Sequence, residues 1–121
     1  MKTQPLREAL ADMASLPDFL GCALVDMQDG MVCHAVGSLA ELEQVVSYSS
    51  DYWRLNQRNQ PVFEGLGDLR VVVLMHRAGQ ITLSECGKRM LLVLVTRRLS
   101  AIDWERWKTD HTRLATLVNQ L

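Results

Sequence analysis

The sequence has few cysteines and none of the residue spacings that build a metal site. Its three cysteines, Cys22, Cys33 and Cys86, form no Cys-x-x-Cys pair, and its three histidines are equally scattered. Zinc and dithiol redox centres need such ligands close together. We therefore expect no metal and no cofactor, and we predict reduced, mostly buried thiols. A bond between Cys22 and Cys33 stays open, because the turn between their strands does not fix which residues lie opposite each other.

Long hydrophobic runs are also missing. The longest apolar stretches, residues 71–75 and 90–95, are far shorter than the roughly 20 residues that a membrane-spanning helix requires. Near the N-terminus, Arg7, Glu8 and Asp12 interrupt any apolar core of a secretion signal. We predict a cytoplasmic protein with no membrane insertion.

Charge of one sign is not in excess. Thirteen basic residues against fourteen acidic ones give a formal net charge of −1, so the chain has no overall field that would attract nucleic acid. With 121 residues, 48% of them hydrophobic, and no repeats or low-complexity segments, the chain is typical of one folded domain over residues 1–121.

Catalytic and nucleotide-binding motifs are absent as well. Neither Gly65-Leu66-Gly67 nor Gly79 stands between a strand and a helix with the spacing of a phosphate-binding loop. A thiol nucleophile could be assembled from Cys33 or Cys86 with His76, but no local motif supports one. We predict a protein that is not an enzyme and binds no nucleotide itself.

The elements that the sequence does contain follow from hydrophobic periodicity and turn residues. Residues 6–16 have helical spacing and stop at Pro17, and the runs 19–25 and 31–36 form a hairpin around the turn 26–30. Ser38 is the expected N-cap of a second helix that ends near Arg58, followed by a loop over 59–68. The runs 69–76, 80–86 and 89–96 form an antiparallel meander, and Ser100 with Asp103 resembles the capping box of a last helix. The order is α-β-β-α-β-β-β-α.

The strand patterns predict how these elements stack. Residues 71–75 and 90–95 are apolar at both parities, whereas a strand with one wet face alternates apolar and polar residues. Both faces of these strands should therefore be covered. The economical solution is an α+β domain with a five-stranded antiparallel sheet and helices on both faces.

One edge strand of the predicted sheet is unprotected, and we expect it to pair with another chain. If the strand 69–76 lies at an edge, its interior has no proline and no inward charge to block further pairing, and only Arg70, His76 and Arg77 stand at its ends. A long apolar edge tends to aggregate unless another chain pairs with it. The simplest partner is a second copy of the same protein.

Aromatic and basic side chains on the helices are further candidates for contacts. Tyr48 and Tyr52 lie one turn apart on the second helix, and aromatic residues are frequent in interface hot spots. Trp53, Trp104 and Trp107 lie on apolar stripes and fit a core position as well as an interface. Arg54 and Arg58 are expected on the exposed side of the second helix, where a solvated rim and partner docking are both open.

The chain resembles the roadblock family of dynein-light-chain-like proteins. The resemblance rests on the element order and on Leu16-Pro17-Asp18-Phe19-Leu20-Gly21-Cys22-Ala23-Leu24-Val25-Asp26 followed by Asp29-Gly30-Met31-Val32. Asp18 stands where the family commonly has Gly, and profilin-like, longin-like and sensor domains share related layouts. The resemblance implies a dimer in which the third strands pair across a two-fold axis and the second helices lie side by side. It also implies, for prokaryotic members, association with small Ras-like GTPases.

The leading hypothesis is thus a non-enzymatic, roadblock-like homodimeric adaptor or regulator that binds a small Ras-like GTPase or another signalling protein. A small-molecule sensor of profilin-like or PAS-like layout is the alternative, and a thiol enzyme is a third. The expected dimer interface combines third-strand residues with second-helix residues, and two arginines of that helix are docking candidates: Val71, Val73, Met75, Val45, Tyr48, Tyr52 and Leu55, with Arg54 and Arg58.

Overall fold

The computed structural model of the chain describes residues 3–97 and 104–120. Its strands and helices follow the predicted order, with two short helical turns added before the third strand. The elements are α1 (Thr3–Ala14), β1 (Phe19–Asp26), β2 (Val32–Gly37), α2 (Leu42–Arg58), α3 (Gln60–Phe63), η1 (Glu64–Leu66), β3 (Val71–Met75), β4 (Gly79–Glu85), β5 (Met90–Arg97) and α4 (Trp104–Asn119).

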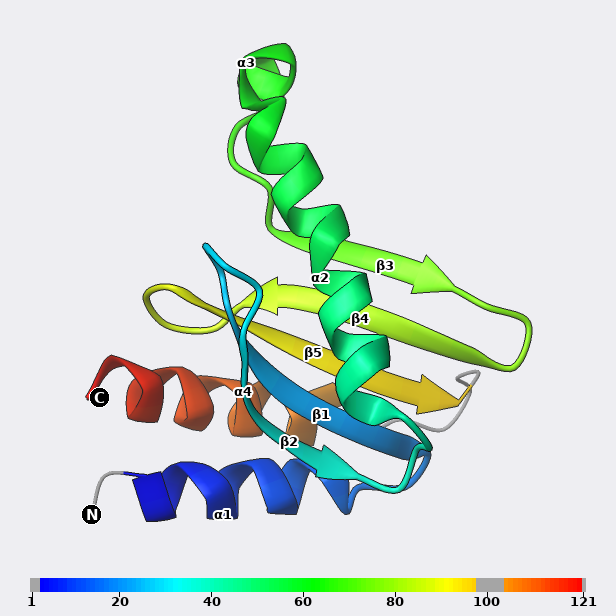
Figure 1. Cartoon of the computed structure of the whole chain (residues 1–121). Coiled ribbons are helices and arrows are strands. Elements are labelled where there is room, and N and C mark those ends of the chain that lie inside the picture. Colours follow the sequence, from blue (N-terminus) through cyan, green and yellow to red (C-terminus); the bar gives the residue numbers. More distant parts are fainter. Residues whose placement is uncertain (1–2, 98–103, 121) are drawn as a thin grey trace.

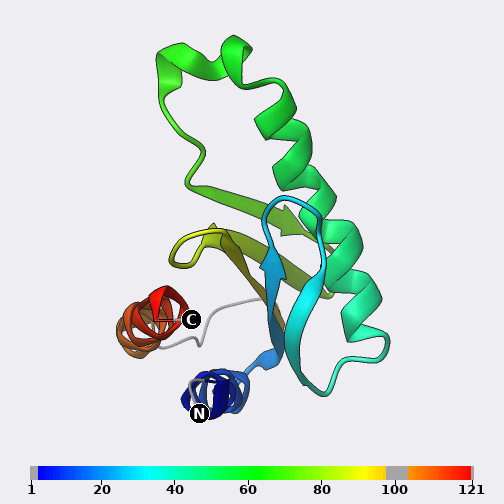
Figure 2. The same cartoon turned by 60° about the vertical axis from the view of Figure 1, so that its left-hand side comes forward.

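The strands form one antiparallel sheet with helices on both of its faces, which confirms the predicted fold class. The strand order is β2-β1-β5-β4-β3, so β2 and β3 are the two edges. Helices α1 and α4 lie side by side on one face, and α2 crosses the other face obliquely (Figures 1 and 2). Within the part of the chain that the structure describes, no helix combines the length and apolarity needed to cross a membrane.

The core has two halves, one on each face of the central strands. Alternate residues of β5 point to opposite sides, so Leu92 and Leu94 pack with α1 and α4 while Leu91, Val93 and Val95 pack under α2. All five are at most 5% exposed. The prediction that the run 90–95 is covered on both faces is therefore confirmed.

The hairpin turn between β1 and β2 is stabilised by the side chains that the sequence places there. The Asp26 carboxylate accepts hydrogen bonds from the backbone N–H groups of Gln28 (2.8 Å) and Asp29 (3.2 Å). Gly30 adopts a left-handed conformation with φ of 76°, and its N–H donates to the Asp26 carbonyl at 3.0 Å. Such Asx interactions and a positive φ at glycine are typical of turns.

A left-handed residue also precedes the first strand. Asp18 has a φ of 68°, a conformation that glycine adopts without strain and aspartate tolerates better than most residues. Its carbonyl accepts a hydrogen bond from the Arg97 N–H at 2.8 Å, which ties the start of β1 to the end of β5. This backbone geometry explains why a glycine would also suit the position.

The predicted N-cap of the second helix is wrong. The backbone N–H groups of Ser38 and Leu39 both donate to the Leu20 carbonyl, which holds this segment against β1. The helix therefore begins later, at Leu42, and its N-cap residue is Glu41, which has a left-handed backbone and makes no side-chain capping bond. Leu39 lies outside the helix but still packs against the core under α2.

The connection from α2 to β3 is more helical than predicted. Residues 59–68 contain α3 and η1, with Pro61 in the first turn of α3, where its missing N–H costs no helical bond. The predicted capping box of Ser100 and Asp103 lies outside the described residues.

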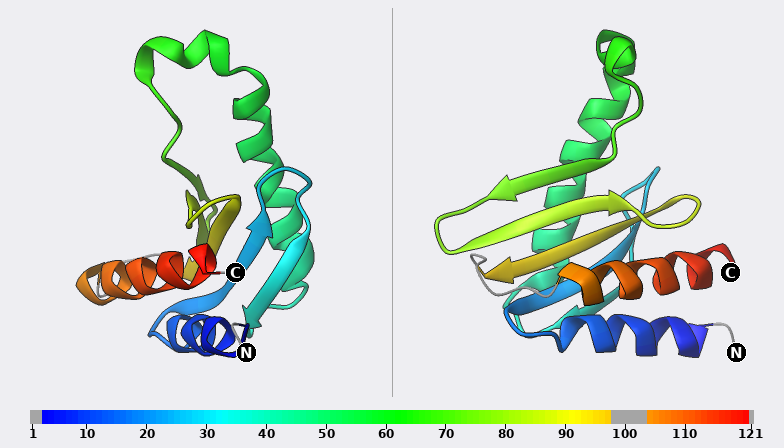
Figure 3. Two further views of the ribbon diagram at one scale, coloured as in Figure 1. Left: turned by 90° about the vertical axis from the view of Figure 1, so that its left-hand side faces the viewer. Right: turned by 180° about the vertical axis from the view of Figure 1, so that it is seen from behind.

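The prediction that both faces of the third strand are covered is wrong. Val72 and Leu74 pack under α2, but Val71, Val73 and Met75, which point to the other face, are 49%, 48% and 74% exposed. The reason is lateral distance: β3 is the strand at the far edge from β2, and the pair α1 and α4 does not extend over it (Figure 3).

The register of β1 and β2 answers the question about a disulfide. Cys22 lies opposite Val36, and His34 lies opposite Leu24, so Cys33 is not the cross-strand neighbour of Cys22. Cys22 is buried, Cys33 is exposed, and all three cysteines are free thiols.

The packing of α4 generates a stability prediction. Leu114 is fully buried in the core beneath α1 and α4. Leu114→Ala should lower the free energy of unfolding by about 2–5 kcal/mol, because it removes buried methyl groups and leaves a cavity. Urea unfolding followed by circular dichroism would measure this. Thr116→Ala on the exposed side of the same helix is the control and should change stability by less than about 0.5 kcal/mol; equal effects would contradict the assigned core.

Candidate interaction surface

Exposed apolar side chains gather on β3 and on the outer side of α2. The largest lie on these two elements and on the turns that connect them: Tyr48, Tyr52, Leu55, Val62, Phe63, Leu66, Val71, Val73 and Met75. Only Met31, in the turn before β2, is a large exposed apolar residue elsewhere in the described part of the chain. Apolar surface concentrated in this way marks interaction sites on soluble proteins.

The backbone of β3 carries hydrogen-bonding groups on its outer edge that pair with no other strand in the described part of the chain. The N–H of His76 donates to the carbonyl of Gly79 at 2.8 Å, and the register pairs Leu74 with Ile81 and Val72 with Leu83. In an antiparallel ladder the residues bonded to a given neighbour alternate. Val72, Leu74 and His76 therefore face β4, and the backbone groups of Val71, Val73 and Met75 point away from the sheet.

Four of the predicted interface residues form a stripe along α2. Val45, Tyr48, Tyr52 and Leu55 recur at spacings of three and four residues, so they share one side of the helix. Tyr48 is 70% exposed, Tyr52 and Leu55 are about half exposed, and Val45 is half-buried. This stripe flanks the buried side of α2, on which Val46 and Trp53 contact the sheet.

The lower end of the stripe borders an apolar hollow. Val45 lines a shallow pocket of about 300 Å³ together with Leu20, Leu39 and Ile81, and with the turn that joins β3 to β4. The hollow places the stripe of α2 and the end of β3 on one continuous surface. The hollow reaches the turn after β3 but not the side chains of Val71, Val73 and Met75, which point to the face away from α2.

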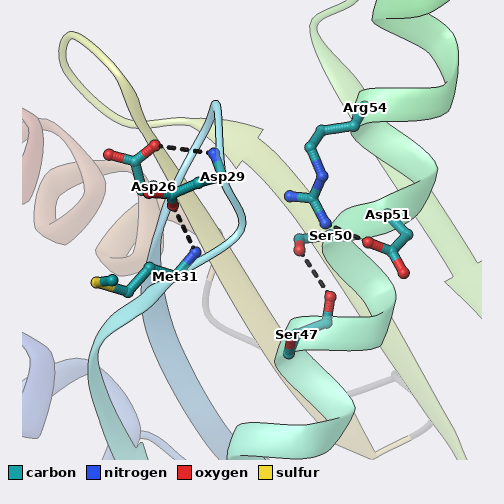
Figure 4. Close-up of polar contacts among 7 residues, drawn as sticks. All are labelled: Asp26, Asp29, Met31, Ser47, Ser50, Asp51 and Arg54. Atoms are coloured by element: carbon teal, nitrogen blue, oxygen red, sulfur yellow. Dashed lines mark hydrogen bonds and ion pairs between the residues drawn. The ribbon is translucent and has the colours of Figure 1, made fainter.

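The arginine candidates lie on the opposite flank of α2, facing the β1–β2 turn. Arg54 pairs with Asp51 one turn earlier on the helix (Figure 4). Its guanidinium lies so close to Gly30 that a β-carbon on that glycine would come within 2.6 Å of it. Arg54 is therefore half-buried and held in place, whereas Arg58 is exposed. The expectation that both lie on an exposed side is wrong for Arg54.

A wide groove separates this flank of α2 from the turn. It has a volume of about 900 Å³ and is lined by Met27, Gln28, Asp51, Arg54, Gln57 and Arg58. The groove is open to solvent and mixes both signs of charge, so it lacks the enclosed, polar-lined pocket that would favour a small-molecule sensor.

Of the tryptophans whose side chains the structure describes, Trp53 does not contribute to this surface, whereas Trp107 lines a groove with Leu66 and Val71. Trp53 is fully buried under α2. Trp107 is half-buried on α4 and lies 5.0 Å from the His111 ring, centroid to centroid. The side chain of Trp104 lies outside the described part of the structure.

The thiols are poorly suited to nucleophilic chemistry. Burial raises the pKa of both Cys22 and Cys86 to about 12. Burial and the carboxylates of Asp26 and Asp29 raise the pKa of Cys33 as well. A thiol whose pKa is raised holds less of the reactive thiolate at neutral pH.

The histidine proposed as a base is not placed beside the thiols. Cys86 follows the last residue of β4, whereas His76 bonds to its first residue, Gly79, so the strand length of roughly 20 Å separates them. Cys33 lies on the opposite edge strand. Among the described residues, no group of three or more histidine, cysteine, aspartate or glutamate side chains could hold a metal ion.

Comparisons with known proteins identify the fold. No profile of a known protein family matches the chain, and no curated protein sequence matches it significantly. Several solved structures do match the chain. The gliding protein MglB from Thermus thermophilus aligns over 99% of this chain and 93% of its own, with a TM-score of 0.78 and 17% identity. Myxococcus xanthus MglB aligns over 97% and 90%, with a TM-score of 0.75 and 11% identity.

A roadblock/LC7 domain from Streptomyces avermitilis aligns over 95% of this chain and 90% of its own, with a TM-score of 0.67 and 21% identity. The agreement covers nearly all of each chain, so the fold is that of roadblock/LC7 domains, as the sequence resemblance predicted.

The burial of the thiols predicts their order of reactivity. In the native protein at neutral pH, iodoacetamide should modify Cys33 alone and slowly, because only that sulfur is exposed. Cys22 and Cys86 should react only after unfolding, as followed by mass spectrometry of the labelled peptides. A Cys33→Ser variant is the control and should take up no label while folded. Rapid native labelling of Cys22 or Cys86 would reopen the thiol-enzyme hypothesis.

Proposed function

We propose that this protein is a non-enzymatic homodimeric adaptor or regulator that binds protein partners, with a small Ras-like GTPase as the partner. The observation that carries the proposal is the free edge of β3. Its outward backbone groups and the exposed side chains of Val71, Val73 and Met75 occur on one strand. A second β3 would satisfy the backbone groups and place matching apolar side chains beside Val71, Val73 and Met75 on the same face.

Symmetry restricts how two copies of β3 can pair. In an antiparallel pair, residues opposite each other point to the same face, so a two-fold axis must pass beside a residue that faces its own copy. With Val73 at the axis, Val71 lies opposite Met75 of the second copy, and every outward-pointing backbone group of the strand has a partner. Centring the pair on Val72 or Leu74 would place some of these groups beyond the end of the other strand.

The other edge of the sheet is less suited to pairing. Both α1 and α2 contact β2, and the pairing of β2 with β1 is interrupted by a bulge at Leu24 and Val25. Bulges and covering helices protect edge strands from further pairing. At β3, the stripe of Val45, Tyr48, Tyr52 and Leu55 extends the pairing surface onto α2, which supports a contact between the two copies of this helix.

The GTPase half of the proposal rests on the resemblance to roadblock proteins and on the fold shared with MglB. An α2 pair would form one platform across the dimer, flanked at both ends by Arg58. An exposed arginine can steer an acidic partner surface and add to its affinity.

The pairing of β3 predicts a change of mass in solution. Wild-type protein should be a dimer by light scattering across a micromolar dilution series, and Val73→Lys should be a monomer, because a charge at the axis would face its own copy. Met31→Lys, at an exposed site beside the opposite edge strand β2, should stay dimeric. A monomeric wild type, or a dimeric Val73→Lys, would contradict pairing at this edge.

The partner can be tested directly by calorimetry. The dimer should bind a small Ras-like GTPase of the same organism with different affinities for its GDP-loaded and GTP-analogue-loaded forms. Arg58→Glu should weaken binding about tenfold, whereas Lys108→Glu on α4 makes the same charge change away from α2 and should have no effect. Absence of binding to every such GTPase would leave the adaptor with another class of protein partner.

A further inference from the structure

The chain between α2 and β3 projects beyond the edge of the sheet. Helix α2 continues past β3, and residues 59–70 turn back through α3 and η1 to reach the start of that strand (Figures 1 and 3). We call this segment, residues 59–70, the overhang. A second sheet that paired with β3 would pass beside it, so the overhang is placed to contact another copy.

The register of the proposed β3 pair determines which part of a second copy reaches the overhang. Suppose that Val73 lies opposite Val73 of the second copy. The two strands run in opposite directions, so a residue a given number of positions before Val73 lies opposite the residue the same number of positions after it in the second copy. Arg77 of the second copy then lies opposite Leu69, and Ala78 of the second copy lies opposite Asp68. The turn between β3 and β4 of one copy therefore meets the overhang of the other.

The charges of the two segments are complementary. Asp68 and Glu64 are exposed on the overhang together with one basic residue, Arg70, so the overhang is net acidic, and Arg77 is exposed at the tip of the turn. Among the described residues, neither Asp68 nor Arg77 lies within ion-pair distance of an opposite charge. Each carries a charge that the described residues of its own copy leave unpaired, and the register brings the two close together across the dimer.

The surface around Asp68 has room for an incoming turn. Asp68 lines a small hollow of about 200 Å³ with Phe63 and Leu69 on the α2 side of the strand. It also lines a groove of about 810 Å³ on the α4 side, together with Leu66 and Val71. The exposed apolar side chains of the overhang border both hollows, so they can contact the aliphatic part of an arginine side chain.

We propose that the overhang of each copy receives the β3–β4 turn of the other, with Asp68 paired to Arg77 across the interface at two symmetric places. The inference rests on the proposed β3 homodimer and adds a function to it: the paired charges fix the register and select a second copy of this chain. In the register centred on Leu74, Arg77 would lie opposite Val71, about 7 Å further along the strand, and the charge pair would be lost.

Two charge reversals test this pairing in trans. In Arg77→Glu homodimers Asp68 would face a glutamate twice, and in Asp68→Arg homodimers Arg77 would face an arginine twice. Each variant alone should dimerise at least about tenfold more weakly than wild type, because attraction becomes repulsion at two symmetric places. Analytical ultracentrifugation in low-salt buffer at pH 8, where an ordinary histidine is neutral, would measure the dissociation constants.

Mixing the two variants is the decisive measurement. A heterodimer of Arg77→Glu with Asp68→Arg restores an acid–base pair at both places, so the equimolar mixture should dimerise within about threefold of wild type, and added salt should reduce the difference. Lys88→Glu and Glu8→Arg are matched controls, because they make the same charge changes at exposed sites away from β3. Circular dichroism would establish that every variant is folded.

The outcomes separate this inference from the proposed function. If wild type dimerises, Val73→Lys does not, and the charge variants behave like their controls, the dimer stands and the charge pairing is wrong. If both single variants are weakened but their mixture gains nothing, the two residues do not meet across the interface, and the pairing is equally wrong. A monomeric wild type would overturn both proposals.

Discussion

The burial of β5 on both faces is the constraint on which the rest of the architecture depends. Its six central residues, 90–95, are apolar at every position, so the fold must supply a layer of helix on each side. One layer is the pair α1 and α4, and the other is the single oblique helix α2. The α2 layer reaches Val72 and Leu74 of β3, but the layer of α1 and α4 does not reach this strand, so one face of β3 stays exposed.

The missing cover leaves β3 with exposed apolar side chains and unpaired backbone groups on the same residues. Val71, Val73 and Met75 expose their side chains on the uncovered face, and the alternation of the ladder turns their backbone groups to the free edge. Each feature alone has an ordinary explanation, because folded proteins expose many apolar atoms and every open sheet has edges. Their coincidence on one proline-free strand is what favours association over simple exposure.

Much of the fold could be predicted because local chemistry specified it. The carboxylate of Asp26 and the glycine at position 30 define a turn without help from distant residues, and the apolar run 90–95 predicted a strand that is covered on both faces. The start of α2 could not be predicted in this way. Ser38 is a good N-cap by type, but its backbone is bonded to Leu20, and this tertiary contact moves the helix start to Leu42.

The candidate surface was predictable to a similar extent. An apolar third strand and tyrosines one helical turn apart are visible in the sequence, and the structure places them on neighbouring elements. The half-buried position of Arg54 could not be predicted from the sequence. It depends on the absence of a β-carbon at Gly30, which lets the guanidinium lie against a turn more than twenty residues away in the chain. Likewise, only the strand order reveals that the run 71–75 lies at an edge and the run 90–95 at the centre.

Pairing through a strand edge raises a problem of specificity. Backbone hydrogen bonds carry no information about sequence, so an open edge such as β3 could pair with any extended chain, and apolar valines discriminate weakly among partners. Selectivity must come from side chains beside the edge whose mismatch is costly. Charged side chains have this property. A charge that is left unpaired or faces a like charge costs binding free energy, whereas a charge that faces an opposite charge adds little affinity. In this chain the exposed charges beside β3 lie at its two ends, on Asp68 and Arg70 before it and on Arg77 after it, and antiparallel pairing brings opposite ends together. The backbone and apolar side chains of β3 therefore supply the affinity, and the charged residues at the ends of the strand are the ones that can select the partner.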